Sequence, residues 1–301
     1  MDFSANPAGI PPLGFTHGGY FHADDVFSAA LLTLLRPDIR IYRGFEVPKG
    51  FSGIAFDIGG GPYDHHTPPL VRRENGVAYA AFGLLWREYG RFFLSEAEAK
   101  RFDEKFVQPL DMDDNVGTGN FLAGLMGTFN PVWDSQQSPD DAFSEAVDTA
   151  KKILENKLES LAAVERAAPL VEKYLKDIKD GIVVMEKYIP WKPVLVPSAA
   201  EFVIFPSLRG GYSVQCVPSD FAAKSPNKVS LPLAWRGKEG QALAEITGVA
   251  GALFCHASGF MVTAGTREDA RTLCRLAKAD FEKRQEQSRA DKARSSQQAK
   301  Q

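Results

Sequence analysis

The sequence predicts an α/β protein of two domains, each folded around its own core. Its 301 residues exceed the usual size of one compact unit. In the N-terminal part, short apolar segments alternate with helical ones, which indicates a mainly parallel sheet with flanking helices. After Lys179-Asp180-Gly181 the pattern changes to β-rich stretches, which indicates a smaller α+β C-terminal domain.

The first strand-loop-helix unit opens the chain. Residues 13–16 are apolar and end in His17-Gly18-Gly19, which is typical of a buried strand that enters a tight turn. Residues 24–35 then repeat apolar side chains at helical spacing, and Arg36-Pro37 ends the expected helix.

A second unit begins at residues 40–42. Residues 53–56 predict another buried strand, which ends at Asp57 before Gly59-Gly60-Gly61. Ligands of parallel sheets bind beyond the carboxyl ends of the strands, so we expect His17 and Asp57 to converge.

The remaining elements follow from caps and periodicity. Ser95 and Glu98 form a capping box, and Ser138-Pro139 opens a long helix. Later strands are expected at residues 182–185, 202–205, 212–217 and 252–255. The expected divisions are residues 1–138 for a metal-binding α/β catalytic domain, 139–180 for bridging helices, 181–282 for a C-terminal substrate-binding domain and 283–301 for a polar, disordered tail.

Composition narrows the class of protein. With 44% hydrophobic and 24% charged residues the chain is typical of a globular protein, and its net charge of −3 argues against a strongly basic nucleic-acid sleeve. The three cysteines show no CxxC spacing, so a disulfide framework or a thiolate zinc site is not expected. No apolar segment is long enough to span a bilayer, and we expect no membrane association and a cytoplasmic location.

Histidines and aspartates cluster near the N-terminus. Four of the five histidines, His17, His22, His65 and His66, occupy one stretch together with Asp24, Asp25, Asp57 and Asp64. Any one of these residues is typical of a solvated turn. Together, however, these residues come from three separate segments, each of which presents His or Asp at or just after a predicted buried strand. Imidazole and carboxylate donors of this kind suit manganese, magnesium, iron or zinc.

The arrangement predicts phosphate chemistry. A carboxylate at the end of a strand can hold two ions about 3.5–4 Å apart, which activate a water and stabilise the attacking and leaving oxygens.

Three runs of the sequence resemble the Myg exonuclease family, which belongs to the DHH phosphoesterase superfamily, named for its Asp-His-His motif. The runs are Thr16-His17-Gly18-Gly19-Tyr20-Phe21-His22-Ala23-Asp24-Asp25, Phe56-Asp57-Ile58-Gly59-Gly60-Gly61-Pro62-Tyr63-Asp64-His65-His66 and Asp111-Met112-Asp113-Asp114-Asn115. The likeness extends to residues 79–86, 233–237 and 254–260, so it covers nearly the whole chain except the tail.

The resemblance implies two divalent ions, usually Mn²⁺ in relatives with Mg²⁺ or Zn²⁺ as alternatives, in a cleft between the two domains. The metal ligands carried over by motif are His17, His22, Asp24, Asp57, His65 and Asp111, with Asp57 bridging both ions. By the same motif, His66 faces the substrate phosphate or the leaving oxygen, and Asp64 orients its neighbours.

Two departures from the superfamily pattern affect the ligand set. His22 stands where an aspartate is common, and Asp113 replaces an apolar residue between the acids of the last motif. Asp111 and Asp114 would share a helical face, so the choice between them stays open. Asp25 and Asp114 are expected to support the ligands.

The C-terminal domain offers candidates for gripping substrate, namely His256, Ser258, Arg267 and Arg236. A guanidinium can fork onto a phosphate, and Arg267 lies where a turn leads into the final helix. The alternatives are a solvated surface charge for Arg267 and a core position for His256.

Our leading functional interpretation is a divalent-metal-dependent phosphodiesterase, a 3′-5′ exonuclease on RNA or short oligonucleotides, as the resemblance implies. One alternative is hydrolysis of a small phosphate compound such as a dinucleotide or pyrophosphate. A metal-binding module without catalysis is the other. Sequence leaves the oligomeric state and the physiological metal open.

Overall fold

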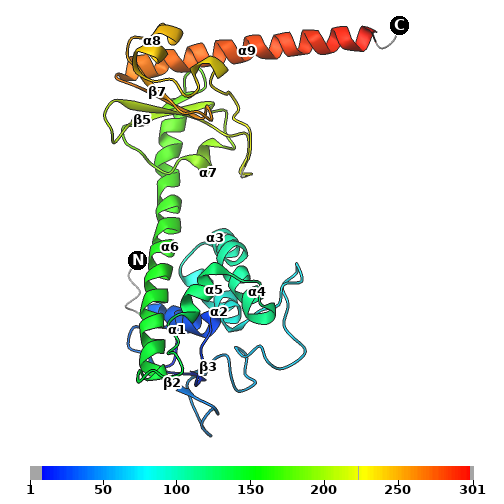
Figure 1. Ribbon diagram of the computed structural model, residues 1–301, viewed down its shortest axis with the longest axis vertical. Coiled ribbons are helices and arrows are strands. Elements are labelled where there is room, and N and C mark those ends of the chain that lie inside the picture. The colour runs from blue at the N-terminus through cyan, green and yellow to red at the C-terminus, as the bar shows by residue number, and fades with distance from the viewer. Residues whose placement is uncertain (1–8, 223, 299–301) are drawn as a thin grey trace. The chain divides into compact units, whose positions relative to one another are not determined.

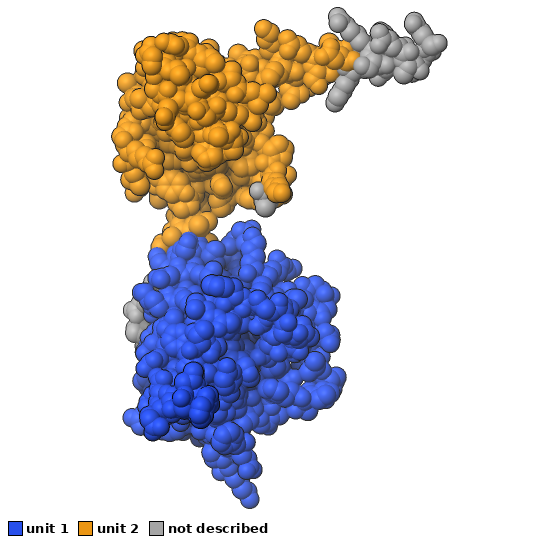
Figure 2. All heavy atoms as spheres, viewed as in Figure 1, with its two compact units in different colours: residues 1–162 blue, residues 163–301 orange. Residues whose placement is uncertain are grey.

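A computed structural model describes residues 9–222 and 224–298, with side chains described to residue 291. The chain divides into two compact units, residues 1–162 and 163–301, which Figures 1 and 2 display. The division lies inside helix α6 (Pro139–Lys176) and not near Gly181. The cause is that one continuous helix packs into both cores: Phe143 and Leu154 belong to the core of unit 1, and Val171 belongs to a core of unit 2.

Unit 1 contains the predicted parallel sheet. Its strands are β1 (Leu13–His17), β2 (Arg40–Gly44) and β3 (Ile54–Ala55), in the order β2-β1-β3, and both pairings are parallel. Phe15 of the central strand pairs with Tyr42 on one side and Ala55 on the other. The carboxyl ends of β1 and β3 therefore open on the same edge, where His17 ends β1 and Asp57 follows β3.

Helices fill the rest of unit 1: α1 (Ala23–Leu35), α2 (Ala81–Tyr89), α3 (Glu96–Phe102), α4 (Gln108–Val116) and α5 (Phe121–Gly127), with a 3₁₀ turn at Gly90–Phe92 and a π-helical turn at Asp103–Val107. Ser95 caps α3 as predicted, accepting a hydrogen bond from the Glu98 backbone N–H. Helix α1 is buried all round, with Thr33 as its one residue that is not buried, and packs its Phe27 against Phe82 and Phe106. Its buried residues include Asp24 and Asp25, whose desolvation must be offset by nearby groups.

The irregular segment between β3 and α2 is fixed to α4 by a buried arginine. Arg73 donates from Nε to Asp103 Oδ2 (2.8 Å), and its Nη2 donates to Asp103 Oδ1 (2.6 Å) and to Asp111 Oδ2 (2.7 Å). The second Asp111 oxygen accepts from the Gly83 backbone N–H of α2 at 3.1 Å. This network joins three separate segments. Removal of one partner would leave the other charge unpaired in the low-dielectric interior.

Unit 2 contains a mixed sheet in the order β4-β5-β6-β8-β7, in which only β4 and β5 are parallel. The strands are β4 (Ile182–Val184), β5 (Phe202–Pro206), β6 (Tyr212–Cys216), β7 (Ala252–Cys255) and β8 (Met261–Ala264). The helices are α7 (Lys192–Leu195), a 3₁₀ turn at Leu233–Trp235, α8 (Gly240–Thr247) and α9 (Arg267–Gln298). Strand β8 was not predicted, because four residues with two buried apolar side chains give too short a pattern.

The C-terminal helix differs from the predicted disordered tail. Helix α9 continues to Gln298, and residues 299–301 lie outside the described part. Phe281 packs on the core of unit 2, and Arg284 pairs with Asp280 one turn earlier at 2.7 Å. Beyond Arg284 the sequence is rich in Ala, Lys, Arg, Glu and Gln, which have high helix propensity even when they bury nothing. Among the described residues, no helix combines the length and the apolarity needed to cross a membrane.

Two glycines of unit 1 should respond to alanine in opposite directions. A Cβ at Gly83 would overlap Asp111 Oδ2, so Gly83→Ala must displace the Arg73–Asp111 pair and should cost about 1–3 kcal/mol of unfolding free energy. Gly124 of α5 has nothing within 4 Å of an added Cβ, so Gly124→Ala should stabilise by about 0.5–1 kcal/mol. Urea unfolding of both variants measures the difference, and equal midpoints would contradict the packing of Asp111 against α2.

Candidate active site

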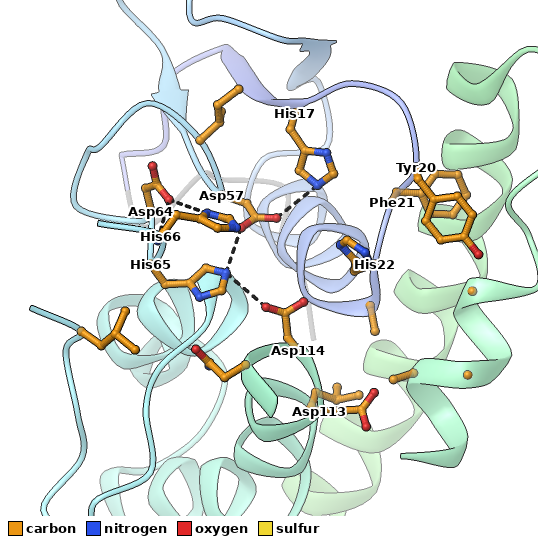
Figure 3. A pocket seen from close by; sticks show the side chains of 18 of the residues that line it. His17, Tyr20, Phe21, His22, Asp57, Asp64, His65, His66, Asp113 and Asp114 are labelled. Carbon is orange, nitrogen blue, oxygen red and sulfur yellow. Dashed lines mark hydrogen bonds and ion pairs between the residues drawn. The ribbon is translucent and has the colours of Figure 1, made fainter. Parts of the chain in front are cut away.

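His17 ends β1, and its ring points toward Asp57 (Figure 3). Its Nε2 lies 3.1 Å from Asp25 Oδ2 and 3.3 Å from Asp57 Oδ2. The hydrogen bonds to Asp25 and then to Asp57 raise the pKa of His17 to about 10 against the opposing effect of burial. Without a metal ion, His17 is therefore the cation that offsets two buried acids.

Asp57 occupies the centre of the cluster. It follows β3 with φ = +58°, in the left-handed region that aspartate tolerates better than most residues. Its Oδ2 faces His17, and its Oδ1 lies 3.1 Å from His65 Nε2. Burial works to raise the pKa of Asp57, but His17 and His65 outweigh it and hold the pKa below its usual value. One carboxylate thus presents an oxygen to each of two groups of side chains.

His65 is buried among three acids. Besides Asp57, its Nε2 lies 3.2 Å from Asp114 Oδ2 and 3.6 Å from Asp24 Oδ2. Burial lowers the pKa of His65, yet Asp114 and Asp57 prevail and raise it to about 10.

His66 is 61% exposed and faces the cavity, in contrast to His65. Asp64 Oδ1 binds both its Nδ1 (2.8 Å) and its backbone N–H (3.0 Å), and Asp64 Oδ2 accepts from the Gly60 backbone at 2.6 Å. Burial acts to raise the pKa of Asp64, but the backbone hydrogen bonds from His66 and Gly60 lower it on balance. Asp64 therefore fixes the orientation of the His66 ring, and its part in catalysis stays a prediction.

The N-terminus of α1 contributes two buried carboxylates and an exposed histidine. Asp25 Oδ1 caps the His22 backbone N–H at 3.0 Å, and the His22 ring lies 6.0 Å from that of His17. Neither oxygen of Asp24 has a hydrogen-bond partner among the described residues. Burial, followed by Asp57 and Asp114, raises the pKa of Asp24 well above its usual value.

Helix α4 sends its two predicted acids to different places. Asp114 lies beside His65, whereas Asp111 is buried against Arg73 and the Gly83 backbone. Burial raises the pKa of Asp111 to about 7 despite the pull of Arg73. The structure therefore does not bring Asp111 to the cluster as expected: Asp111 is paired with Arg73, and Asp114 lies beside His65 in a candidate metal group.

Three groups of side chains have ligand atoms within 4.8 Å of one another, so each could hold a metal ion. The groups are His17/Asp25/Asp57, Asp57/His65/His66 and His22/Asp24/Asp114. Their mixed imidazole and carboxylate donors suit manganese, magnesium or zinc. Both Asp24 oxygens are buried without a hydrogen bond among the described residues. Asp25 Oδ2, Asp57 Oδ1 and His65 Nε2 are buried too, and their partners are other members of the cluster, at 3.1 Å for His17–Asp25 and for His65–Asp57. Buried carboxylate oxygens with so few partners are what an ion would satisfy.

The cluster lines a cavity of about 870 Å³, drawn in Figure 3, whose lining residues all lie in unit 1. Small residues of α5, Ala123, Gly124 and Gly127, form part of its wall. Asn130 clamps the loop before α1, accepting from the Phe21 N–H (3.0 Å) and donating to the Phe21 C=O (2.8 Å). Sequence reasoning missed these residues and Arg73. The small residues at helical spacing were a weak signal for the cavity wall. No local pattern indicated the structural roles of Asn130 and Arg73, because both depend on contacts far away in the sequence.

In unit 2, three of the predicted substrate contacts share one end of the sheet. His256 Nδ1 lies 2.8 Å from Ser258 Oγ, and the tight turn at Gly259 brings its backbone against Arg236. Arg267 follows the other end of β8 and lies over the Tyr212 ring at 5.7 Å. The structure therefore groups His256, Ser258 and Arg236 but not Arg267, and their role in substrate binding stays a prediction.

Comparison with known proteins gives one family. A sequence model of that family, MYG1 exonuclease, described as an uncharacterised protein family (UPF0160), matches residues 15–277. The MYG1 exonuclease of Homo sapiens is 28% identical, over 88% of this chain and 85% of its own length. The MYG1 exonuclease of Bos taurus is also 28% identical (88% and 84%), and the MYG1 protein of Dictyostelium discoideum is 24% identical (85% and 93%). No solved structure matches the chain.

In the metal-free protein His17 and His65 should titrate near pH 10, against the ordinary value of 6.5. Because folding raises both pKa values, their ion pairs contribute stability fully below pH 6.5 and lose it as the pH rises through 10. NMR titration of the imidazole rings in chelator, with urea unfolding at matched pH, measures both effects. Rings that titrate near 6.5 would contradict the ion pairs.

Asp111 and Asp114 should separate folding from metal binding. Asp111→Asn weakens the partner of Arg73 and should cost about 1–3 kcal/mol of unfolding free energy, with metal content retained. Asp114→Asn should lower Mn²⁺ affinity at least tenfold, on the order of 1.4 kcal/mol. Its loss of stability should be smaller, because the ion-pair partner of Asp114 among the described residues is His65 and not an arginine. Calorimetry of Mn²⁺ binding and urea unfolding measure the pair, and the reverse assignment of effects would return Asp111 to the cage.

Proposed function

The chain belongs to the MYG1 exonuclease family, and on that premise we propose that it is a divalent-metal-dependent phosphodiesterase, a 3′-5′ exonuclease on RNA or short oligonucleotides. The human and bovine relatives carry the name exonuclease. The likeness to the DHH phosphoesterases, which the sequence motifs suggest, is part of this proposal.

The observation that carries the proposal is the set of buried carboxylates without sufficient positive charge. Asp57 belongs to two of the three candidate metal groups and directs a different oxygen to each. His17 and Asp25 would hold one ion together with Asp57, and His65 would hold another together with Asp57. The remaining group, His22, Asp24 and Asp114, would complete the cage. Divalent ions bound by these residues would supply positive charge for activating a water and stabilising the oxygens of an in-line displacement.

The residues of the chain have separate roles in this scheme. Asp64 holds His66 by Nδ1, which leaves Nε2 of an exposed ring free to face a substrate oxygen in the cavity. We assign His66 the proton that goes to the leaving oxygen, because general acid catalysis needs a group within hydrogen-bond reach of that atom. His65 is buried and enclosed by acids, so it is assigned to the metal.

A small phosphate compound is the second candidate substrate. The cavity of about 870 Å³ falls within the range of small-ligand sites, roughly 300–1,000 Å³. A dinucleotide would fit the same chemistry. A module that only binds metal is less favoured, because Asp64 already engages Nδ1 of His66 and the exposed ring faces the cavity, where a substrate can reach it.

The test is an activity panel on end-labelled RNA oligonucleotides, dinucleotides and pyrophosphate with Mn²⁺, Mg²⁺, Zn²⁺ or Ca²⁺. We expect mononucleotide release from the oligonucleotides with Mn²⁺, abolition by chelator, and less activity with Ca²⁺, which prefers all-oxygen sites. His66→Ala should lower kcat at least about 100-fold while Mn²⁺ content is unchanged.

The matched control is His65→Ala, which should lose bound Mn²⁺ and turnover together. Activity that survives chelation, or normal turnover and metal content in both histidine variants, would refute the proposal. Hydrolysis of pyrophosphate alone would select the small-substrate alternative.

A further inference from the structure

A second cavity adjoins the one that contains the His and Asp cluster. Its volume is about 410 Å³, and Leu70 and Asn115 line both cavities. One wall is the segment between β3 and α2, and the other is α4, so the whole hollow lies within unit 1. Because the two cavities share wall residues, they lie next to each other along the same two walls.

The second cavity combines a cation with apolar surface. Of the described residues that line it, Arg72 alone is charged. Met112 and Val116, one turn apart on α4, are 41% and 74% exposed. Large apolar side chains exposed beside a single guanidinium and the amide of Asn75 match the parts of a nucleotide: a flat base or sugar, hydrogen-bonding edges and a phosphate.

Arg72 is available to a ligand. With the described residues it makes one hydrogen bond, from Nη1 to the Gly76 carbonyl at 2.9 Å, and none of their carboxylates lies at ion-pair distance. The adjacent Arg73 is buried and committed to Asp103 and Asp111. Arg72 therefore keeps most of its five N–H donors for a planar, charge-assisted contact, which phosphate provides.

Hydrogen bonds fix the two walls of the second cavity relative to each other. Asn75 Nδ2 donates to Gln108 Oε1 at 2.9 Å, and Asn115 Nδ2 donates to the Tyr79 carbonyl at 3.2 Å. Each bond ties one wall to the other, and the Arg73–Asp111 pair does the same beneath them. Because these walls are already fixed before binding, less conformational entropy is lost when a ligand binds between them.

We propose that the second cavity binds the nucleotide that follows the one at the His and Asp cluster, with its phosphate on Arg72 and its base or sugar against Met112 and Val116. This inference rests on the proposed phosphodiesterase function and narrows its substrate to an oligonucleotide. A small phosphate compound would fill the first cavity and leave Arg72 without a role.

The experiment compares two substrates with Mn²⁺: an RNA tetranucleotide and the p-nitrophenyl phosphodiester of a single nucleoside. Arg72→Ala should lower the ratio of kcat/KM for the tetranucleotide to kcat/KM for the ester about tenfold, through KM and not kcat. Arg72→Lys should restore part of the ratio, since the ammonium keeps the charge but loses the planar fork. Met112→Glu, which places a negative charge on the apolar wall, should lower the ratio as well.

The control is Arg40→Ala, an exposed arginine that opens β2 and lines neither cavity, which should keep the wild-type ratio. If wild type cleaves both substrates and the ratio is unchanged in Arg72→Ala and Met112→Glu, the second nucleotide site is refuted while the phosphodiesterase function stands. Wild type that cleaves neither substrate overturns both.

Discussion

The concentration of negative charge in a low dielectric is the constraint on which the rest of unit 1 depends. Four aspartates, Asp24, Asp25, Asp57 and Asp114, meet around two imidazoles, and three of the four are buried. Two like charges 4 Å apart repel by about 4 kcal/mol at an effective dielectric of 20. Burial, with Asp57 and Asp114 beside it, raises the pKa of Asp24, whereas His17 and His65 hold the pKa of Asp57 below its usual value against the effect of burial. Two protonated imidazoles supply two positive charges against four negative ones. Two divalent ions would balance the cluster.

The fold holds these acids together by using the ends of its elements. His17 and Asp57 end or follow parallel strands, and Asp24 and Asp25 open a helix whose N-terminal dipole favours carboxylates. Helix α4 shows the same constraint from the other side. Its Asp111 is buried as deeply as the cluster acids, but it has its own cation in Arg73, so it stabilises the packing of three segments. A carboxylate's role here follows from which positive charge it meets.

Sequence predicted what local pattern encodes and missed what depends on distant contacts. Strand β1, helix α1 and the meeting of His17 with Asp57 followed from apolar periodicity and the rule for parallel sheets. The choice between Asp111 and Asp114 did not, because a helical face places both acids alike and only Arg73, 38 residues earlier, separates them. The helical tail was missed for a different reason: low hydrophobicity was taken as disorder, although the residues have high helix propensity.

The segment between β3 and α2 links the chemistry to the substrate's length. Its residues His65 and His66 line the first cavity, Arg72 lines the second, and Leu70 lines both. Arg73 anchors the same segment to α4 through Asp111. Helix α4 is divided in the same way, with Asp114 at the cluster and Met112 and Val116 along the second cavity. Since both walls serve both cavities, a chain held by the second is positioned along the same rigid elements that hold the cluster. The binding energy of the second nucleotide, which lies away from the reacting phosphate, could then be used to orient that phosphate at the cluster. Enzymes use binding energy from remote parts of a substrate in this way to favour the transition state.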